Sequence, residues 1–416
     1  MLWTGLWCLM ARFGPLGDYP AFSTSIVTWP TFAQIVSVGG RSLIDFLMAL
    51  FGTCTYELMV GIYQHHTTVC NTTRPLLSNV DNEEEEEAGQ TANATALRAV
   101  EIKHWLLPIM IYCFILSCVL TYGGISINIR KGSFFQVNYP QYVPKTVPVG
   151  CVVGPGTDYP KLQLQQDIWF KKSASLAESG AKLIVWSELT TSVTDTEEEV
   201  KLIQKAKEFA KQHQVYLGIT YAKEQPVGQN KLVLITKEGI IGIDYNKAHP
   251  VPGVESQPAG LEVLQYVDTQ EFGRIGGGIC FDYNFPHFIS QASTHHVDVM
   301  IQPSWTWGPI GTYHQQGNIL RAVENGFTLF RCVSQGVSGI FEPTLDGIFT
   351  QKVASLNVQK YLFYLPVQTR VPTMYGLFGD TFGYLCLIMS VSTLVYVLTL
   401  KRKKNKIIAG IVFESD

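Results

Sequence analysis

The stretch "GGGICFDYNFP" (276–286) places Cys280 after three glycines and one apolar residue, with an acidic residue two positions later. A cysteine that only packs in a core needs no such approach, whereas one presented to a substrate at the end of a strand does. Glycine permits sharp backbone turns, so the run predicts that the chain turns at this point. We therefore expect Cys280 to act as a nucleophile at a strand end, with core packing as the alternative for the cysteine taken alone.

Around this stretch, from about residue 145 to 370, short apolar segments alternate with polar segments of helical periodicity. Apolar residues recur at helical spacing in 197–214, which predicts an amphipathic helix, and a second helix is expected through 318–326. The predicted strands cover 181–188, 215–222, 231–239, 240–247, 273–282 and 297–305. Strands that alternate with helices and are joined by hairpins indicate a layered α/β domain.

Three of these strands end at an ionisable residue, namely Glu188, Lys247 and Cys280. If the strands align, the three side chains project from the same edge of a sheet. A glutamate can take the proton of a thiol and return it to a leaving group. A lysine ammonium can stabilise the oxyanion of a tetrahedral intermediate, with the backbone N–H of Phe281 as a second donor. Taken together, the three residues favour catalysis over separate surface and packing roles.

The hydrophobic content of the chain, 46% against 16% charged residues, is concentrated in a few segments. Segments 105–127 and 381–400 each hold about 20 residues without a charge, enough to cross a bilayer. A third candidate, 42–63, contains Asp45 and Glu57, which we expect near an interface or against neighbouring helices. The composition predicts an integral, multi-pass membrane protein.

The basic run "KRKKNK" (401–406) directly follows the last span, and such clusters stay on the cytoplasmic side. Residues 128–380 are then expected on the opposite, extracytoplasmic face. The loop 64–104 would be cytoplasmic, with its acidic run "DNEEEEE" solvated and disordered, and its sequons at Asn71 and Asn93 unmodified. Residues 1–13 are too few to span a membrane. We expect them to form an interfacial segment or the tail of a helix.

The remaining composition excludes several classes of function. The formal net charge of −3 gives no argument for a nucleic-acid partner. The nine cysteines show neither a CxxC pair nor a Cys/His spacing typical of zinc, so we predict no metal site and no cofactor. They also show no disulfide framework, and thus do not indicate a redox compartment.

Four motifs, "IVWSE", "YNKAHPVPGVE", "GGGICFDYNFP" and "RAVENG", resemble those of the carbon–nitrogen hydrolase (nitrilase) superfamily. Within it, the chain is similar to the membrane-embedded branch of apolipoprotein N-acyltransferases. The resemblance implies a four-layer α-β-β-α sandwich inserted between transmembrane helices. The expected division is a partial transmembrane region 1–127 with spans at about 42–63 and 105–127, a catalytic domain 128–375, a transmembrane helix 376–400 and a basic cytoplasmic tail 401–416.

The resemblance also implies a role for each site residue. Glu188 would be the general base, Lys247 the transition-state stabiliser and Cys280 the nucleophile that forms a thioester. Glu255 matches a second glutamate near the active site, with a plain loop carboxylate as the alternative. Asp282 stands where the acyltransferases carry a glutamate, and would help to hold the site.

Two departures from the family pattern bear on the substrate. Ser187 replaces a proline in the first motif, and "HPVPGVESQP" lacks the Phe–Gly of the loop that follows the lysine. About three spans are visible, fewer than the branch carries. The resemblance implies a lipoprotein acceptor, but no residue of this sequence identifies it.

We consider three functions on this basis. The first is an N-acyltransferase that moves an acyl chain from a phospholipid to an amine. The second is a membrane-anchored amidase or nitrilase-type hydrolase, in which water resolves the thioester and the substrate is an amide. The third is a scaffold without activity, against which the intact Glu188, Lys247 and Cys280 argue. An apolar cleft next to the membrane would favour the transferase, and a closed polar cleft the hydrolase.

Overall fold

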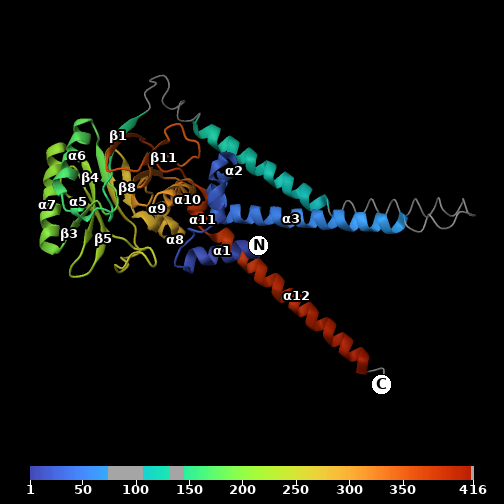
Figure 1. The fold of residues 1–416 in the computed structure, drawn as a ribbon. Coiled ribbons are helices and arrows are strands. Elements are labelled where there is room, and N and C mark those ends of the chain that lie inside the picture. The colour runs from blue at the N-terminus through green and yellow to red at the C-terminus, as the bar shows by residue number, and fades with distance from the viewer. Residues whose placement is uncertain (74–105, 132–144, 414–416) are drawn as a thin grey trace, which may run out of the picture.

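The computed structural model describes residues 1–73, 106–131 and 145–413, and two β-sheets form the centre of its largest part (Figure 1). The first sheet has the order β13-β1-β2-β4-β5-β6, with β3 beside β4. The pairs β1–β2 and β2–β4 are parallel, whereas β4, β5 and β6 pair as antiparallel hairpins. Its strands are β1 (Thr146–Val152), β2 (Leu183–Trp186), β3 (Thr191–Val193), β4 (Tyr216–Lys223), β5 (Gln229–Ile235), β6 (Ile241–Asn246) and β13 (Lys360–Pro366).

The second sheet has the order β12-β11-β10-β9-β8-β7. The strands β8, β9 and β10 are parallel, and the two ends of the sheet pair in antiparallel fashion. Its strands are β7 (Gln265–Thr269), β8 (Gly273–Gly277), β9 (Val299–Trp305), β10 (Thr328–Ser334), β11 (Gly336–Phe341) and β12 (Gln351–Ser355). Both sheets therefore contain parallel as well as antiparallel strand pairs, as expected where strands alternate with helices and hairpins.

Apolar side chains of the two sheets meet in one buried cluster, which includes Leu234 of the first sheet and Met300 of the second. Helices cover the outer faces. On the first sheet, Trp169 of α6 (Gln166–Glu178) and Phe209 of α7 (Thr196–His213) pack in a second cluster with Trp186. On the other side lie α8 (Pro286–Ile289), α9 (Gln291–Thr294) and α10 (Pro309–Asn325). The domain is the predicted four-layer α-β-β-α sandwich.

A disulfide between Cys151 of β1 and Cys332 of β10 joins the two sheets. No local pattern indicates this disulfide, because the two cysteines are 181 residues apart and belong to no recognisable spacing motif. The expectation of no disulfide framework is therefore corrected at this pair.

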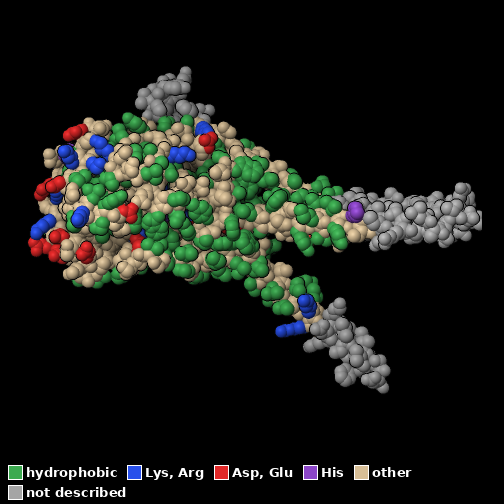
Figure 2. Space-filling model, viewed as in Figure 1, with side chains coloured by type: hydrophobic (Ala, Val, Ile, Leu, Met, Phe, Trp, Pro, Cys, Tyr) green, Lys and Arg blue, Asp and Glu red, His purple; other side chains and the backbone are tan. Residues whose placement is uncertain are grey.

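Among the described residues, three helices are long and apolar enough to cross a membrane. They lie in α3 (Val36–Thr73), in the helix Leu106–Lys131 and in α12 (Thr381–Phe413). All three extend away from the sandwich on the same side (Figure 1). Figure 2 shows hydrophobic side chains over these helices and the adjoining part of the domain, while charged side chains gather at the far end of the domain. This distribution is that of a membrane protein with its polar domain at one end.

The first of these helices is longer than the sequence predicted. It begins at Val36 and continues to Thr73, so the start of the expected loop 64–104 is helical. The rest of that loop, with its acidic run and Asn93, lies outside the described residues. Glu57 is exposed on this helix, whereas Asp45 is buried.

Buried ion pairs hold this helix to the sandwich. Arg41 lies 2.9 Å from Asp18, and Asp18 also pairs with Arg321 of α10. The backbone N–H of Arg41 donates to Glu324 over 2.8 Å. Because unpaired buried charges are strongly destabilising, this network fixes the N-terminal segment and α3 against α10.

The N-terminal segment reaches from the long helices to the centre of the domain. The helix α1 (Leu2–Phe13) packs against α12 and α3, and η1 (Phe22–Thr28) and α2 (Pro30–Ala33) lead into α3. The backbone N–H of Asp18 donates to the carbonyl of Asn284, which lies within the cysteine motif 276–286. Residues 14–21 thereby lie next to the region in which the candidate nucleophile stands.

Candidate active site

The three predicted strand-end residues lie around one cavity, but they come from both sheets. Glu188 follows β2 and Lys247 follows β6 in the first sheet, whereas Cys280 follows β8 in the second. The expectation of one common sheet edge is thus corrected. The side chains meet because the two sheets pack face to face with these strand ends adjacent.

The strand that leads to the cysteine is shorter than predicted. It ends at Gly277, and Cys280 opens the short 3-10 helix η3 (Cys280–Asn284). The N–H of Ile279 donates to Asp282 Oδ2 over 2.8 Å. This hydrogen bond to a side chain takes the place of a backbone hydrogen bond to a neighbouring strand. A side-chain acceptor that captures a backbone donor in this way ends a strand and begins a turn.

The turn itself is made by Cys280, not by the glycines. Cys280 has φ of +46°, a left-handed conformation that costs energy for any residue with a Cβ. Its carbonyl accepts from Gln302 Nε2 over 3.2 Å, and Arg331 holds Gln302 in turn over 2.9 Å. The glycines are needed for close packing instead, since a Cβ at Gly277 would lie 2.9 Å from a methyl of Leu232 in the facing sheet.

A buried ion pair stands beside the cysteine. Lys247 Nζ donates to Glu188 Oε1 over 2.8 Å, and both residues are 1% exposed. Glu188 also accepts from Asn230 Nδ2 over 2.8 Å and, at its other oxygen, from the N–H of Trp305 over 2.7 Å. Every contact of this carboxylate is a donor, so the ionised form is stabilised in a fixed position.

Glu255, the second glutamate named from the sequence, lies beside Lys247. Lys247 Nζ donates to both of its oxygens, over 3.0 and 2.8 Å, and the N–H of Val251 donates over 2.6 Å. One ammonium group therefore stands between two carboxylates.

The surroundings set the protonation state of each group at rest. Burial raises the pKa of Cys280 far above its usual range, and the nearby charge of Glu188 raises it further, so the sulfur is a thiol. Burial lowers the pKa of Lys247, but the opposing effects of Glu188, Cys280 and Glu255 together outweigh it, so the net pKa is raised and the amine is an ammonium. A thiol at rest needs a base before it can attack.

Phe281 and Asp282 lie on different sides of the turn. Phe281 lines the cavity, and its N–H belongs to the first turn of η3, where backbone donors lack partners within the helix. Asp282 is fully buried and accepts from Tyr245 OH over 2.8 Å and from the N–H of His249 over 2.9 Å. Asp282 thus ties the cysteine turn to the chain after Lys247.

The cavity has a volume of about 200 Å³ and holds the polar group at one wall. Apolar and aromatic side chains make most of the remaining lining, and they include Leu16, Tyr19, Phe281, Trp305, Trp307 and Ile310. Leu16 and Tyr19 belong to the N-terminal segment that connects the sandwich to the long helices. The cavity is therefore apolar and is walled in part from the membrane side.

Several site residues were not found from the sequence. Asn230 donates to Glu188, Gln302 donates to the carbonyl of Cys280, and Arg331 donates to Gln302. His314 lines the cavity, and burial and then Arg331 lower its pKa, so the ring is neutral. Since Arg331 faces its Nδ1 over 3.3 Å and can only donate, the ring proton is on Nε2. His314 Nε2 has no hydrogen-bond partner among the described residues.

Residues 161–362 match the family model described as carbon-nitrogen hydrolase. The match covers the sandwich from α5 (Pro160–Gln163) into β13 and contains Glu188, Lys247 and Cys280. Fold and match together define an enzyme domain of the class that uses an active-site cysteine. Over these residues the chain is similar to the carbon–nitrogen hydrolase family.

Two similar proteins are named apolipoprotein N-acyltransferase. The one from Rickettsia prowazekii (strain Madrid E) is 25% identical over 330 residues, which cover 69% of this chain and 60% of that protein. The one from Rickettsia typhi (strain ATCC VR-144 / Wilmington) is 29% identical over 180 residues, 38% of this chain and 35% of that protein. The chain spans less than two thirds of the length of either of these curated relatives.

Among solved structures, an amidase from Nesterenkonia sp. AN1 in complex with butyramide is 16% identical, with a TM-score of 0.46. The match covers 57% of this chain and 95% of that one. A member of the nitrilase superfamily from Saccharomyces cerevisiae is 18% identical, with a TM-score of 0.43, over 56% of this chain and 93% of that one.

Replacing Asn230 by alanine is expected to move the acid limb of the pH–rate profile to higher pH. Burial raises the pKa of Glu188, and the hydrogen bond from Asn230 counteracts part of this by stabilising the carboxylate. Without that bond the pKa of Glu188 rises further, so the base form is lost at a higher pH. The rate of acylation measured across pH in the two proteins checks this. An unchanged acid limb would contradict the assignment of that limb to Glu188.

Proposed function

We propose that this protein is a membrane-bound acyltransferase that moves an acyl chain from a phospholipid to an amine through a thioester on Cys280. Glu188 is the general base, Lys247 the stabiliser of the oxyanion, and Glu255 the partner that positions Lys247. The names of the two relatives point to the same class of reaction. They leave the acceptor of this chain open beyond its being an amine.

The observation that carries the proposal is the cavity in which these residues meet. Its lining is apolar apart from the polar group, His314 and Thr306, and its N-terminal wall leads to the membrane-spanning helices. An apolar acyl chain gains free energy on burial in such a cavity, whereas a small polar amide does not need it. The ester group of a phospholipid can reach Cys280 while the rest of the lipid stays on the membrane side.

The first half-reaction begins with the neutral thiol. Glu188 takes the proton as Sγ attacks the ester carbonyl, and the C–S bond forms while the carbonyl oxygen becomes an oxyanion. The Lys247 ammonium and the N–H of Phe281 stabilise that charge. When the C–O bond breaks, Glu188 returns the proton to the departing lysophospholipid oxygen, and a thioester remains.

The second half-reaction runs over the same groups. An amine attacks the thioester, Glu188 removes a proton from its nitrogen, and the C–S bond breaks. The thiolate of Cys280 takes back that proton, and the product is an amide. Water in place of the amine would give a fatty acid, so the same groups allow hydrolysis and the acceptor decides the outcome.

Two features support an extracytoplasmic position for the sandwich. The basic run 401–406 follows the last span, at the end of α12 remote from the domain (Figure 1). The disulfide between Cys151 and Cys332 is of a kind that forms in oxidising compartments and is rare in the cytosol. We therefore propose a multi-pass protein with its site on the lumenal, periplasmic or extracellular side.

We expect Cys151 and Cys332 to be fully oxidised in protein isolated from membranes. Alkylation before and after reduction, followed by peptide mass analysis, measures this directly. Cys332→Ala is expected to lower the free energy of unfolding by about 2–5 kcal/mol, because the bridge closes a very long loop. Free thiols at both positions in freshly isolated membranes would contradict the proposed orientation.

The test of the function follows the products. Purified protein in detergent is incubated with a phospholipid, with and without an amine-bearing peptide, and lysophospholipid, fatty acid and acylated peptide are quantified. Amine-dependent lysophospholipid release with acylated peptide supports the proposal. Fatty acid in equal amount without the peptide indicates a lipid hydrolase, and release of ammonia from simple amides alone indicates an amidase.

A further inference from the structure

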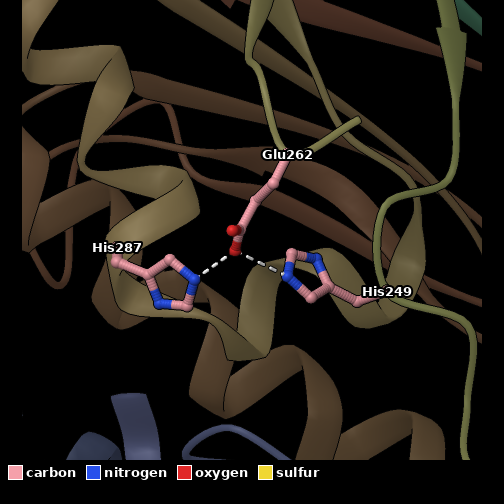
Figure 3. A group of neighbouring side chains, drawn as sticks. All are labelled: His249, Glu262 and His287. Carbon is pink, nitrogen blue, oxygen red and sulfur yellow. Dashed lines mark hydrogen bonds and ion pairs between the residues drawn. The ribbon is translucent and has the colours of Figure 1, made fainter. Parts of the chain in front are cut away.

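A second group of ionisable side chains lies outside the cavity. His249 and Glu262 belong to the connection between β6 and β7, and His287 belongs to α8. One nitrogen of each ring and an oxygen of Glu262 all lie within 4.8 Å of one another. Figure 3 shows the two rings pointing at the carboxylate from opposite sides. His249 Nε2 is 2.9 Å from Glu262 Oε1, and His287 Nε2 contacts the same oxygen.

The orientation of His249 is fixed by groups behind it. Its Nδ1 lies 2.9 Å from Asp282 Oδ1, and its ring stacks on Phe285 with 3.7 Å between centroids. A carboxylate at Nδ1 accepts the proton there, so an ion that replaced the hydrogen bond between Nε2 and Glu262 would meet the Nε2 lone pair. A carboxylate behind a histidine is the usual outer partner of a metal-binding imidazole. Asp282 is itself anchored by Tyr245 and by the N–H of Ile279.

The other two side chains are also placed by the fold. The carbonyl of Glu262 accepts from Gln291 of α9 over 3.2 Å, and the N–H of Leu264 donates to the same side chain over 3.0 Å. His287 follows Pro286 in the short helix α8, with its side chain 19% exposed. The Glu262 side chain is 45% exposed, so water can reach the centre of the group.

We propose that His249, Glu262 and His287 bind a zinc ion, with water as the fourth ligand. Two imidazoles and one carboxylate are a ligand set that zinc accepts, whereas magnesium and calcium prefer oxygen alone. Ligand atoms around tetrahedral zinc lie about 3.3–3.6 Å apart for bonds of about 2.0–2.2 Å. Shifts on the order of an ångström bring the three atoms to that spacing. The charges of Glu262 and Asp282 together balance the two positive charges of the ion.

The ion would join the two chain segments that carry the proposed catalytic residues. His249 stands two residues after Lys247, and His287 stands seven residues after Cys280. A bond from each to one ion fixes the connection after β6 against α8. The zinc site is therefore a positioning element outside the cavity, and it goes beyond the proposed function, since it holds whichever acceptor the enzyme uses.

This site also explains why the sequence predicted no metal. The ligands are separated by 13 and 25 residues, and only the packing of α8 against the loop brings them together. No short spacing motif of the type used for zinc fingers describes such a set.

The test measures metal directly, on full-length protein purified in detergent with a tag that contains no histidine. Four proteins are stripped of metal with a chelator, dialysed and titrated with zinc. They are the wild type, Glu262→Gln, His287→Ala and the control His295→Ala. Zinc content per chain and the midpoint of thermal unfolding are recorded, and cobalt is added in parallel for its visible absorption. His295 lies on the same domain and contacts Tyr266, and it is not one of the three proposed ligands.

We expect about one zinc per wild-type and His295→Ala chain, a rise of the unfolding midpoint on zinc addition, and cobalt bands of a four-coordinate site. Zinc affinity should fall at least about tenfold in Glu262→Gln and His287→Ala. Wild-type protein that takes up no zinc and shows no change in its midpoint would overturn the proposal, and this arm does not depend on any variant folding. Equal zinc uptake by all four proteins would also overturn it. Acyl transfer is assayed separately, so failure of either proposal leaves the other measurable.

Discussion

Replacing Glu188 by glutamine is expected to slow acylation of Cys280 by about 10²- to 10⁴-fold, the usual worth of a positioned general base. Burial raises the pKa of Cys280, so the protein holds no ready thiolate that could attack without a base. Glutamine keeps the shape of the side chain and can still accept from the N–H of Trp305. Lys247 retains Glu255 as its partner, and the fold should therefore persist.

Single-turnover acylation rates, together with thermal unfolding in detergent, separate these effects. Glu238→Gln is the matched control, because this glutamate is exposed in the turn between β5 and β6. The control should keep the wild-type rate. An acylation rate for Glu188→Gln within a few-fold of wild type would show that another group removes the thiol proton.

Replacing Lys247 by methionine is expected to lower the free energy of unfolding by about 3–5 kcal/mol and to abolish measurable transfer. Removal of one partner from a buried ion pair leaves the other charge uncompensated. Here two carboxylates, Glu188 and Glu255, would remain together with no cation between them. The same change removes the ammonium proposed to stabilise the oxyanion, so activity and stability fall together.

Two further variants distinguish the loss of stability from the loss of activity. Lys201→Met removes an exposed pair with Glu197 on α7, where solvent screens the charges, and should leave the free energy of unfolding nearly unchanged. The double variant Glu188→Gln/Lys247→Met removes a buried charge of each sign and should recover part of the lost stability without recovering activity. Recovery of acyl transfer in the double variant would contradict the role given to Lys247.

The pH dependence of the Lys247→Met variant provides a separate check. Burial raises the pKa of Glu188 above its unfolded value, and loss of the lysine charge removes the main opposing effect. A carboxyl with a raised pKa binds more protons in the folded state, so stability increases as the pH falls through that raised pKa toward the unfolded value. Thermal unfolding of the variant should therefore shift upward on acidification.

Much of the fold follows from local pattern. The helix at 197–214 was predicted from its periodicity and is α7, and the boundary between the predicted strands 231–239 and 240–247 falls in the turn between β5 and β6. The strand ends at Glu188 and Lys247 were also visible, since a charge after an apolar run marks the point where a buried strand reaches the surface of its sheet. Resemblance of the motifs to a known family supplied the layer order, which periodicity alone does not determine.

The parts that could not be predicted all depend on packing between segments far apart in sequence. Which sheet carries Cys280 depends on strand order, and the glycine at 277 is explained by Leu232 in the facing sheet. The disulfide and the ligands of the proposed zinc site are likewise brought together by contacts that no local spacing encodes. Asn230 is an ordinary polar residue in the sequence, and only its hydrogen bonds to Glu188 and Glu255 give it importance.

The central claim is that Cys280 carries the acyl chain, and intact mass of the protein after incubation with phospholipid tests it most directly. Wild-type protein should gain the mass of one acyl group, and hydroxylamine should remove that mass because it cleaves thioesters. Cys280→Ala should gain nothing under the same conditions. An adduct of equal size on the alanine variant, or lysophospholipid formation by wild type with no hydroxylamine-sensitive adduct at any time, would contradict the account.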